Sequence, residues 1–132
     1  MKQPKAKSKE LSNSAHIIIY LSNDGKTKID VCMKSETMWL TQAQIAELFE
    51  RDISVISRHI KNIFTEQELH QKSNLQIMQI PFSDKLVTFY SLDVIIAIGY
   101  WVKSPHGTQF RQWATSILHE YMPKGFSIND DF

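Results

Sequence analysis

Residues 40–64, LTQAQIAELFERDISVISRHIKNIF, constrain the fold more than any other part of the chain. Thr41 and Gln44 have the spacing of a capping box, so a helix begins at this point. Asp52 is a second candidate for a helix N-cap. The apolar residues that follow it repeat at helical spacing: Ile56, Ile60, Ile63 and Phe64. The segment therefore predicts two short helices joined by a tight turn.

The spacing of these positions is typical of a helix-turn-helix. Ala46 is small at the point where two steeply crossing helices approach most closely. Glu50 stands where the turn of this motif often has glycine, and Arg51 stands where an apolar residue is common. We expect a helix-turn-helix over residues 40–64, with the second helix as the recognition helix.

The exposed face predicted for the second helix carries hydroxyl and cationic side chains. Such side chains reach phosphates and base edges in a major groove, and arginine can hold guanine through two hydrogen bonds. This element, residues 51–64, has a net charge of +2, because it contains three cations and one acid: Arg51, Arg58, Lys61 and Asp52. The whole chain carries +1. The alternative is that these side chains form only the solvated face of a protein-interaction helix. The residues that we expect to contact double-stranded DNA are Gln42, Ile53, Ser54, Ser57, Arg58, Lys61 and Lys85.

Two hairpins are predicted, one on each side of the helix pair. Within residues 16–35, the dipeptide Asp24-Gly25 separates two β-rich segments and favours a tight hairpin turn. Residues 74–90 contain two further β-like segments. Because this second hairpin follows the helix pair, it has the position of a wing, with Lys85 near its tip.

Residues 91–125 predict two C-terminal helices that complete the core. Ser91 can cap the first, and Thr108 can cap the second. Pro123 and Gly125 are expected to end the second helix. Its apolar stripe consists of Phe110, Trp113, Ala114, Ile117, Leu118 and Tyr121.

Length and composition predict one domain over residues 16–132, preceded by a flexible basic arm at residues 1–15. Together with the elements above, this predicts an α+β fold: a small winged helix-turn-helix with two short hairpins. The chain has 132 residues, of which 42% are hydrophobic and 22% are charged, as in globular domains. No apolar run reaches the roughly 18 residues that a membrane span needs, and no signal-peptide pattern follows the basic arm. The single cysteine, Cys32, cannot form an internal disulfide and is expected to be inert. We expect a cytoplasmic protein.

The sequence lacks catalytic and metal-binding patterns. Its five histidines show no HExxH or paired-cysteine spacing, and it has no glycine-rich phosphate loop or GxSxG motif. We therefore expect no enzyme activity, no metal, no cofactor and no small-molecule substrate. A toxin or nuclease-associated enzyme would need an acidic or histidine-rich site.

The apolar C-terminal region predicts a homodimer. Tyr100, Trp101 and Met122 exceed what one small core can bury, and the nearly neutral charge does little to oppose self-association. Helix-turn-helix proteins commonly pair so that two recognition helices lie about 34 Å apart on the duplex. We expect the dimer to form through the C-terminal helices.

Two blocks of the sequence, MWLTQAQIAELFERDISVISRHIKNIF and FYSLDVIIAIGYWVKSPHGTQFRQWATSILHEYMPKGFSIND, resemble a known family. They are similar to the N-terminal region of the RhuM family of virulence-associated and prophage-encoded bacterial proteins, from about Ile17 to Asp130. The second block also resembles, more loosely, the FRxW-containing end of phage antirepressor domains of the Bro-N type. The resemblance implies a DNA-binding transcriptional regulator without catalytic residues. The alternative is a protein-interaction module of antirepressor type that modulates another regulator.

Overall fold

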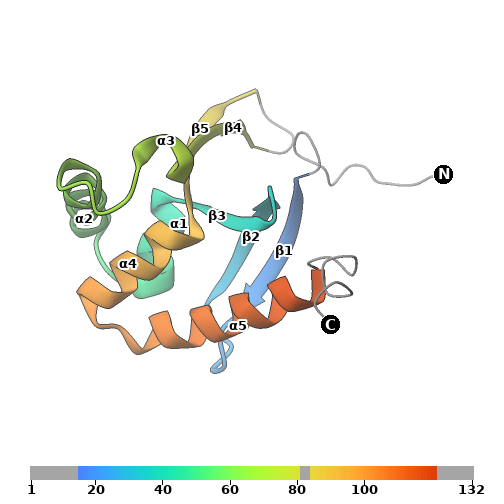
Figure 1. Cartoon of the computed structure of the whole chain (residues 1–132). Helices are drawn as coiled ribbons and strands as arrows, with labels where there is room; N and C mark the ends of the chain where they lie inside the picture. Colours follow the sequence, from blue (N-terminus) through green and yellow to red (C-terminus); the bar gives the residue numbers. More distant parts are fainter. Residues whose placement is uncertain (1–14, 81–83, 122–132) are drawn as a thin grey trace, which may run out of the picture.

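The computed structural model describes residues 15–80 and 84–121, so the predicted basic arm lies outside the described residues except for Ala15. The elements, in chain order, are β1 (His16–Leu21), β2 (Lys28–Lys34), β3 (Thr37–Thr41), α1 (Gln42–Phe49), α2 (Ile53–Thr65), α3 (Gln71–Asn74), β4 (Leu75–Gln79), β5 (Leu86–Ser91), α4 (Leu92–Val102) and α5 (Pro105–Tyr121). The strands form one antiparallel five-stranded sheet in the order β1-β2-β3-β5-β4. Figure 1 shows α4 and α5 below the strands and α2 at the left edge of the molecule.

The main core lies between one face of the sheet and the helices α1, α2, α4 and α5. In β2, Ile29 and Met33 point into this core, as their alternation in the sequence predicts. Tyr20 of β1 packs edge-on against Phe110 and Trp113 of α5, with ring centroids 5.1 and 5.0 Å away. These aromatic contacts tie the first strand to the last helix.

A strand that the sequence analysis did not predict, β3, joins the two predicted hairpins into one sheet. Trp39 of β3 lies opposite Cys32 of β2 on one side and opposite Ser91 of β5 on the other. Met38, Trp39 and Leu40 are all buried, because both faces of β3 are covered, and such a continuous apolar run hides the alternation of a strand. The hairpin of β4 and β5 therefore belongs to the central sheet, and its role as a wing stays a prediction.

The other face of the sheet also carries a buried apolar cluster. Cys32 packs there with Trp39, Met78 and Phe89. Burial raises the pKa of the Cys32 thiol to about 11. The thiol therefore stays protonated at neutral pH, which makes it a poor nucleophile and metal ligand, in line with the inert role expected for it.

The start of α5 differs from the prediction. The helix begins at Pro105, and Thr108 lies within its first turn instead of capping it. Ser104 takes the capping role, since its Oγ accepts a hydrogen bond of 3.1 Å from the backbone N–H of His106. Proline is favoured at the first helical position, where its missing N–H costs nothing. The predicted end of the helix at residues 123–125 lies outside the described residues.

Helices α4 and α5 cross closely at two glycines, against the end of α1. A Cβ atom at Gly99 would lie 3.1 Å from Cζ of Phe49 and 3.5 Å from Cα of Gly107. A Cβ atom at Gly107 would lie 3.4 Å from Cε1 of the same ring. Phe49 is the last residue of α1 and is buried. Its ring therefore fixes the end of α1 in the crossing of the two C-terminal helices.

Candidate functional site

Both helices of the predicted pair begin with the N-caps expected from the sequence. Thr41 Oγ1 accepts from the Gln44 backbone N–H at 3.1 Å, and Gln44 Oε1 accepts from the Thr41 N–H at 2.9 Å, which completes the capping box of α1. At the start of α2, the Asp52 carboxylate accepts from the backbone N–H of Ser54 at 2.9 Å and also from its hydroxyl. Local sequence therefore sets where each helix starts.

The end of α1 explains why glutamate can stand in a turn that often has glycine. Glu50 adopts the left-handed conformation, with φ 56° and ψ 47°. Its backbone N–H donates a hydrogen bond of 3.3 Å to the carbonyl oxygen of Glu47. The N–H of Arg51 donates one of 3.0 Å to the carbonyl oxygen of Ala46. This pair of bonds is a Schellman motif. The chain therefore reverses after α1 without glycine, and α2 begins three residues later.

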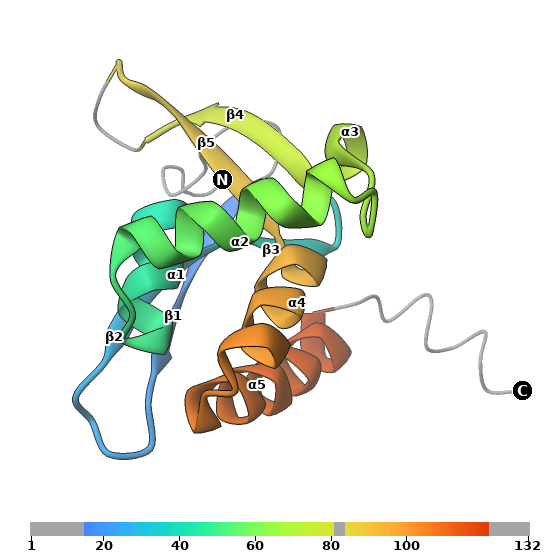
Figure 2. The same cartoon turned by 90° about the vertical axis from the view of Figure 1, so that its left-hand side faces the viewer.

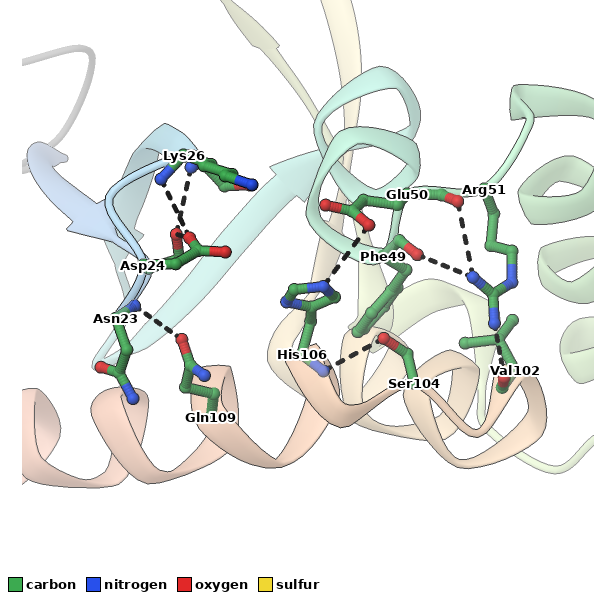
Figure 3. A network of polar contacts seen from close by, with 12 residues as sticks. Asn23, Asp24, Lys26, Phe49, Glu50, Arg51, Val102, Ser104, His106 and Gln109 are labelled. Carbon is green, nitrogen blue, oxygen red and sulfur yellow. Dashed lines mark hydrogen bonds and ion pairs between the residues drawn. The ribbon is translucent and has the colours of Figure 1, made fainter.

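The side chain of Arg51 anchors the turn to α4. Its guanidinium donates to the carbonyl oxygen of Phe49 at 3.1 Å and to that of Val102 at 2.9 Å (Figure 3). These are carbonyls at the ends of α1 and α4, where a cation is favourable. The sequence analysis counted Arg51 with the DNA-facing charge, but its guanidinium is engaged within the fold. The cations that remain on the exposed face are Arg58 and Lys61.

Contacts from α5 hold the same turn and the first hairpin. His106 Nε2 lies 3.5 Å from Oε1 of Glu50, and Gln109 Oε1 accepts from the backbone N–H of Asn23 at 2.8 Å (Figure 3). The Tyr20 hydroxyl donates to the same Gln109 oxygen at 3.2 Å. The position of the helix pair is therefore set by the C-terminal helices as well as by its own turn.

The outer face of α2 is exposed along its length. Figure 2 shows α2 running across the face of the molecule nearest the viewer, with α1 behind it. Within residues 15–80 and 84–121, neither Arg58 nor Lys61 forms an ion pair or a side-chain hydrogen bond. The predicted contact residues that lie on this face are Ile53, Ser54, Ser57, Arg58 and Lys61, all exposed.

The structure brings three of the predicted residues, Gln42, Ser57 and Lys61, to one groove of about 420 Å³. The groove lies beside α2, between the start of α1 and the Leu75–Tyr90 end of the β4–β5 hairpin. No sequence pattern points to the lining residues outside the helix pair, since Leu75 and Tyr90 come together only when β4 pairs with β5. The remaining lining residues are Ile60, Phe64, Thr65, Gln71, Leu75 and Tyr90.

Lys85 is not brought to this site. In the β4–β5 pair, Leu75 lies opposite Tyr90 and Gln79 lies opposite Leu86. The groove is at the Tyr90 end, whereas Lys85 precedes Leu86 at the other end. Leu86 and Tyr90 are four positions apart along the strand, a span of about 13 Å. Lys85 therefore does not line the groove.

The described residues form neither a candidate metal site nor a membrane-spanning helix. Among residues 15–80 and 84–121, no three His, Cys, Asp or Glu side chains gather where they could hold a metal ion. In the same ranges, no helix combines the length and the apolar character needed to cross a membrane.

Comparison with known protein families gives a match over the last part of the chain. Residues 81–132 match the family described as the Virulence protein RhuM family. The matched segment includes β5, α4 and α5, and it begins after α1 and α2. No curated protein and no solved structure matches the chain, and no match supports the looser similarity to Bro-N domains. Residues 81–132 of this chain are therefore similar to the virulence protein RhuM family.

Proposed function

We propose that this chain is a DNA-binding protein that places α2 in the major groove of double-stranded DNA. The observation that carries the proposal is the exposed face of α2, where Arg58 and Lys61 have no intramolecular partner within the described residues. Ser54 and Ser57 lie on the same face. An α-helix fits the major groove, and side chains of these types bond to phosphates and to base edges.

The rigid attachment of α2 supports the proposal. The caps at Thr41 and Asp52, the left-handed Glu50 and the Arg51 guanidinium fix the helix pair before any ligand binds. A helix that is already ordered loses little conformational entropy on binding, so more of the energy of its contacts contributes to affinity. In this proposal, the chain acts in the bacterial cytoplasm as a prophage-type or virulence-associated transcriptional regulator.

A duplex titration at several salt concentrations tests the proposal. Each phosphate contact contributes a slope of roughly −0.9 to the dependence of log affinity on log salt. We expect Arg58→Ala and Lys61→Ala each to reduce the magnitude of the slope by about one unit. Lys28→Ala is the matched control, because Lys28 is an exposed cation at the start of β2.

Two results would contradict the proposal. The first is no duplex binding at low salt by the folded chain. The second is a slope that changes equally in all three variants, which would indicate diffuse attraction by net charge and not a site on α2.

The exposure of Ile53 favours a second candidate function. This side chain is 47% exposed at the start of α2, where an apolar group suits a protein partner. An antirepressor-type module would use the same helix to bind another regulator. Under that function, Ile53→Ser abolishes binding to the partner regulator, and affinity for duplex DNA is absent at every salt concentration.

A further inference from the structure

The groove beside α2 is lined by polar side chains that form no side-chain hydrogen bond with any residue that the structure describes. Within residues 15–80 and 84–121, none of its six polar lining residues makes a side-chain hydrogen bond. Polar groups next to the groove are paired: Ser91 Oγ donates to Asn74 Oδ1 at 2.6 Å, and Asn74 Nδ2 donates to the His70 carbonyl at 2.8 Å. The six side chains with unused hydrogen-bonding capacity are Gln42, Ser57, Lys61, Thr65, Gln71 and Tyr90.

The charge of the groove favours an anion. Lys61 is the charged residue among its nine lining residues, and none of the nine is acidic. Gln42 and Gln71 each offer an amide that both donates and accepts hydrogen bonds. A bound molecule with a negative group could pair with the Lys61 ammonium. If it also had a planar edge of hydrogen-bond donors and acceptors, it could bind the two glutamine amides.

Aromatic rings line the same groove. The rings of Phe64 and Tyr90 have centroids 6.3 Å apart and are tilted by 30°. Burial raises the pKa of Tyr90 above its ordinary value, and its hydroxyl can both donate and accept a hydrogen bond. Ile60 and Leu75 add apolar surface. Such walls favour a flat ring over a hydrated sugar or a bare phosphate.

We propose that this groove binds a nucleotide unit, with its base against Phe64 and Tyr90 and its phosphate at Lys61. A groove of about 420 Å³ is of the size that small ligands occupy, since ligand pockets span about 300 to 1,000 Å³. The nucleotide is either free or an unpaired residue of a DNA strand, and the two sources present the same chemistry. The inference goes beyond the proposed function, because no duplex needs to lie along α2.

An intact duplex does not satisfy this groove. Its bases are stacked and paired, so they offer no ring face to an aromatic wall, whereas an unpaired nucleotide does. Binding of blunt duplex and binding of an unpaired nucleotide are therefore separable at Gln71, which lines the groove alone, whereas Lys61 belongs to both proposals.

Calorimetric titration of the full chain with three probes tests the proposal: dAMP at millimolar concentration, a single-stranded oligothymidine and a blunt duplex. We expect Gln71→Ala and Lys61→Gln to weaken binding of dAMP or of the single strand about tenfold each, as expected for one lost hydrogen bond to a charged or polar group. Asn62→Ala is the matched control for Gln71→Ala, since Asn62 is an exposed amide on α2 outside the groove. Lys28→Gln is the control for Lys61→Gln.

The three probes distinguish a free nucleotide from an unpaired residue of DNA. They also distinguish nucleotide binding in the groove from duplex binding by α2. Binding of dAMP points to a free nucleotide, and binding of the single strand alone points to an unpaired residue of DNA. We expect Gln71→Ala to leave affinity for blunt duplex unchanged, so the groove and the duplex site can fail independently. Absence of binding to both dAMP and the single-stranded oligothymidine overturns the proposal, as does an equal loss of affinity in Asn62→Ala and Gln71→Ala.

Discussion

Glu50 ends α1 in a backbone conformation that is unfavourable for a residue with a side chain. At φ 56°, its Cβ is crowded against the backbone, which costs roughly 1 to 2 kcal/mol. The residue is exposed, and its contact with His106 contributes little because water screens it. The strain is therefore only partly offset by interactions of its side chain.

Replacement of Glu50 by glycine should stabilise the protein. Glycine adopts this conformation freely, so we expect Glu50→Gly to raise the free energy of unfolding by up to about 1 kcal/mol, measured by urea denaturation. Glu47→Gly is the matched control within the same helix, where the substitution should instead cost about 1 kcal/mol. Loss of stability in both variants would show that the contact with His106 outweighs the strain.

Asp52 should make the stability of the fold dependent on acidic pH. Hydrogen bonds from the hydroxyl and the backbone N–H of Ser54 lower the pKa of its carboxyl below the ordinary value of 3.8. The ionised cap therefore stabilises the fold fully above about pH 4, and this contribution is lost as the pH falls through the lowered pKa.

The variant Asp52→Asn isolates this effect. Asparagine still accepts the bond from the backbone of Ser54 but does not titrate. We expect the wild type to lose more stability than Asp52→Asn between about pH 5 and pH 3, as followed by thermal melting. Asp24, whose pKa is also lowered, titrates in both proteins and cancels in the comparison. Parallel curves would contradict the prediction.

At the scale of elements, the sequence predicted those features that depend on neighbouring residues, such as the helix caps. The caps at Thr41, Asp52 and Ser91 depend on residues within three positions of each other, and all three are present. Strand β3 was missed although it follows β2 closely in the chain, because burial of both its faces hides the alternation of a strand. The groove was missed for a different reason: Leu75 and Tyr90 come together only through the pairing of β4 with β5.

The packing of α1 against its neighbours should tolerate no larger side chain at Ala46. This residue is 9% exposed and belongs to the main core, whereas Ala43 of the same helix is exposed. We expect Ala46→Leu to lower the free energy of unfolding by about 1 to 3 kcal/mol through overpacking, with any duplex affinity lost in parallel. Ala43→Leu should change the melting temperature little. Equal melting of Ala46→Leu and the wild type would show that no close helix crossing lies at this residue.

At the scale of the whole molecule, α4 presents apolar side chains to solvent. Tyr100 is 73% exposed, Trp101 is 52% exposed and Ile96 is 38% exposed. Tyr100 and Trp101 also contact each other edge to face, with ring centroids 5.7 Å apart. Met122, which the sequence analysis grouped with them, lies outside the described residues. The net charge of +1 does little to oppose association through this surface.

We expect the chain to form a homodimer through α4 at micromolar concentration, measured by sedimentation. Trp101→Ser should shift the protein to a monomer, because aromatic residues contribute strongly to interfaces. Ile77→Ser is the matched control, since Ile77 is 62% exposed on β4. A wild-type monomer contradicts the prediction, as does a dimer that survives Trp101→Ser and disappears in Ile77→Ser.

The strand order has a consequence for whether the matched segment can fold by itself. The family match begins at residue 81, yet β5, the strand within it, lies between β3 and β4, which both precede that residue. A fragment that begins at residue 81 would therefore leave both edges of β5 unpaired. We expect such a fragment to need the preceding strands in order to fold.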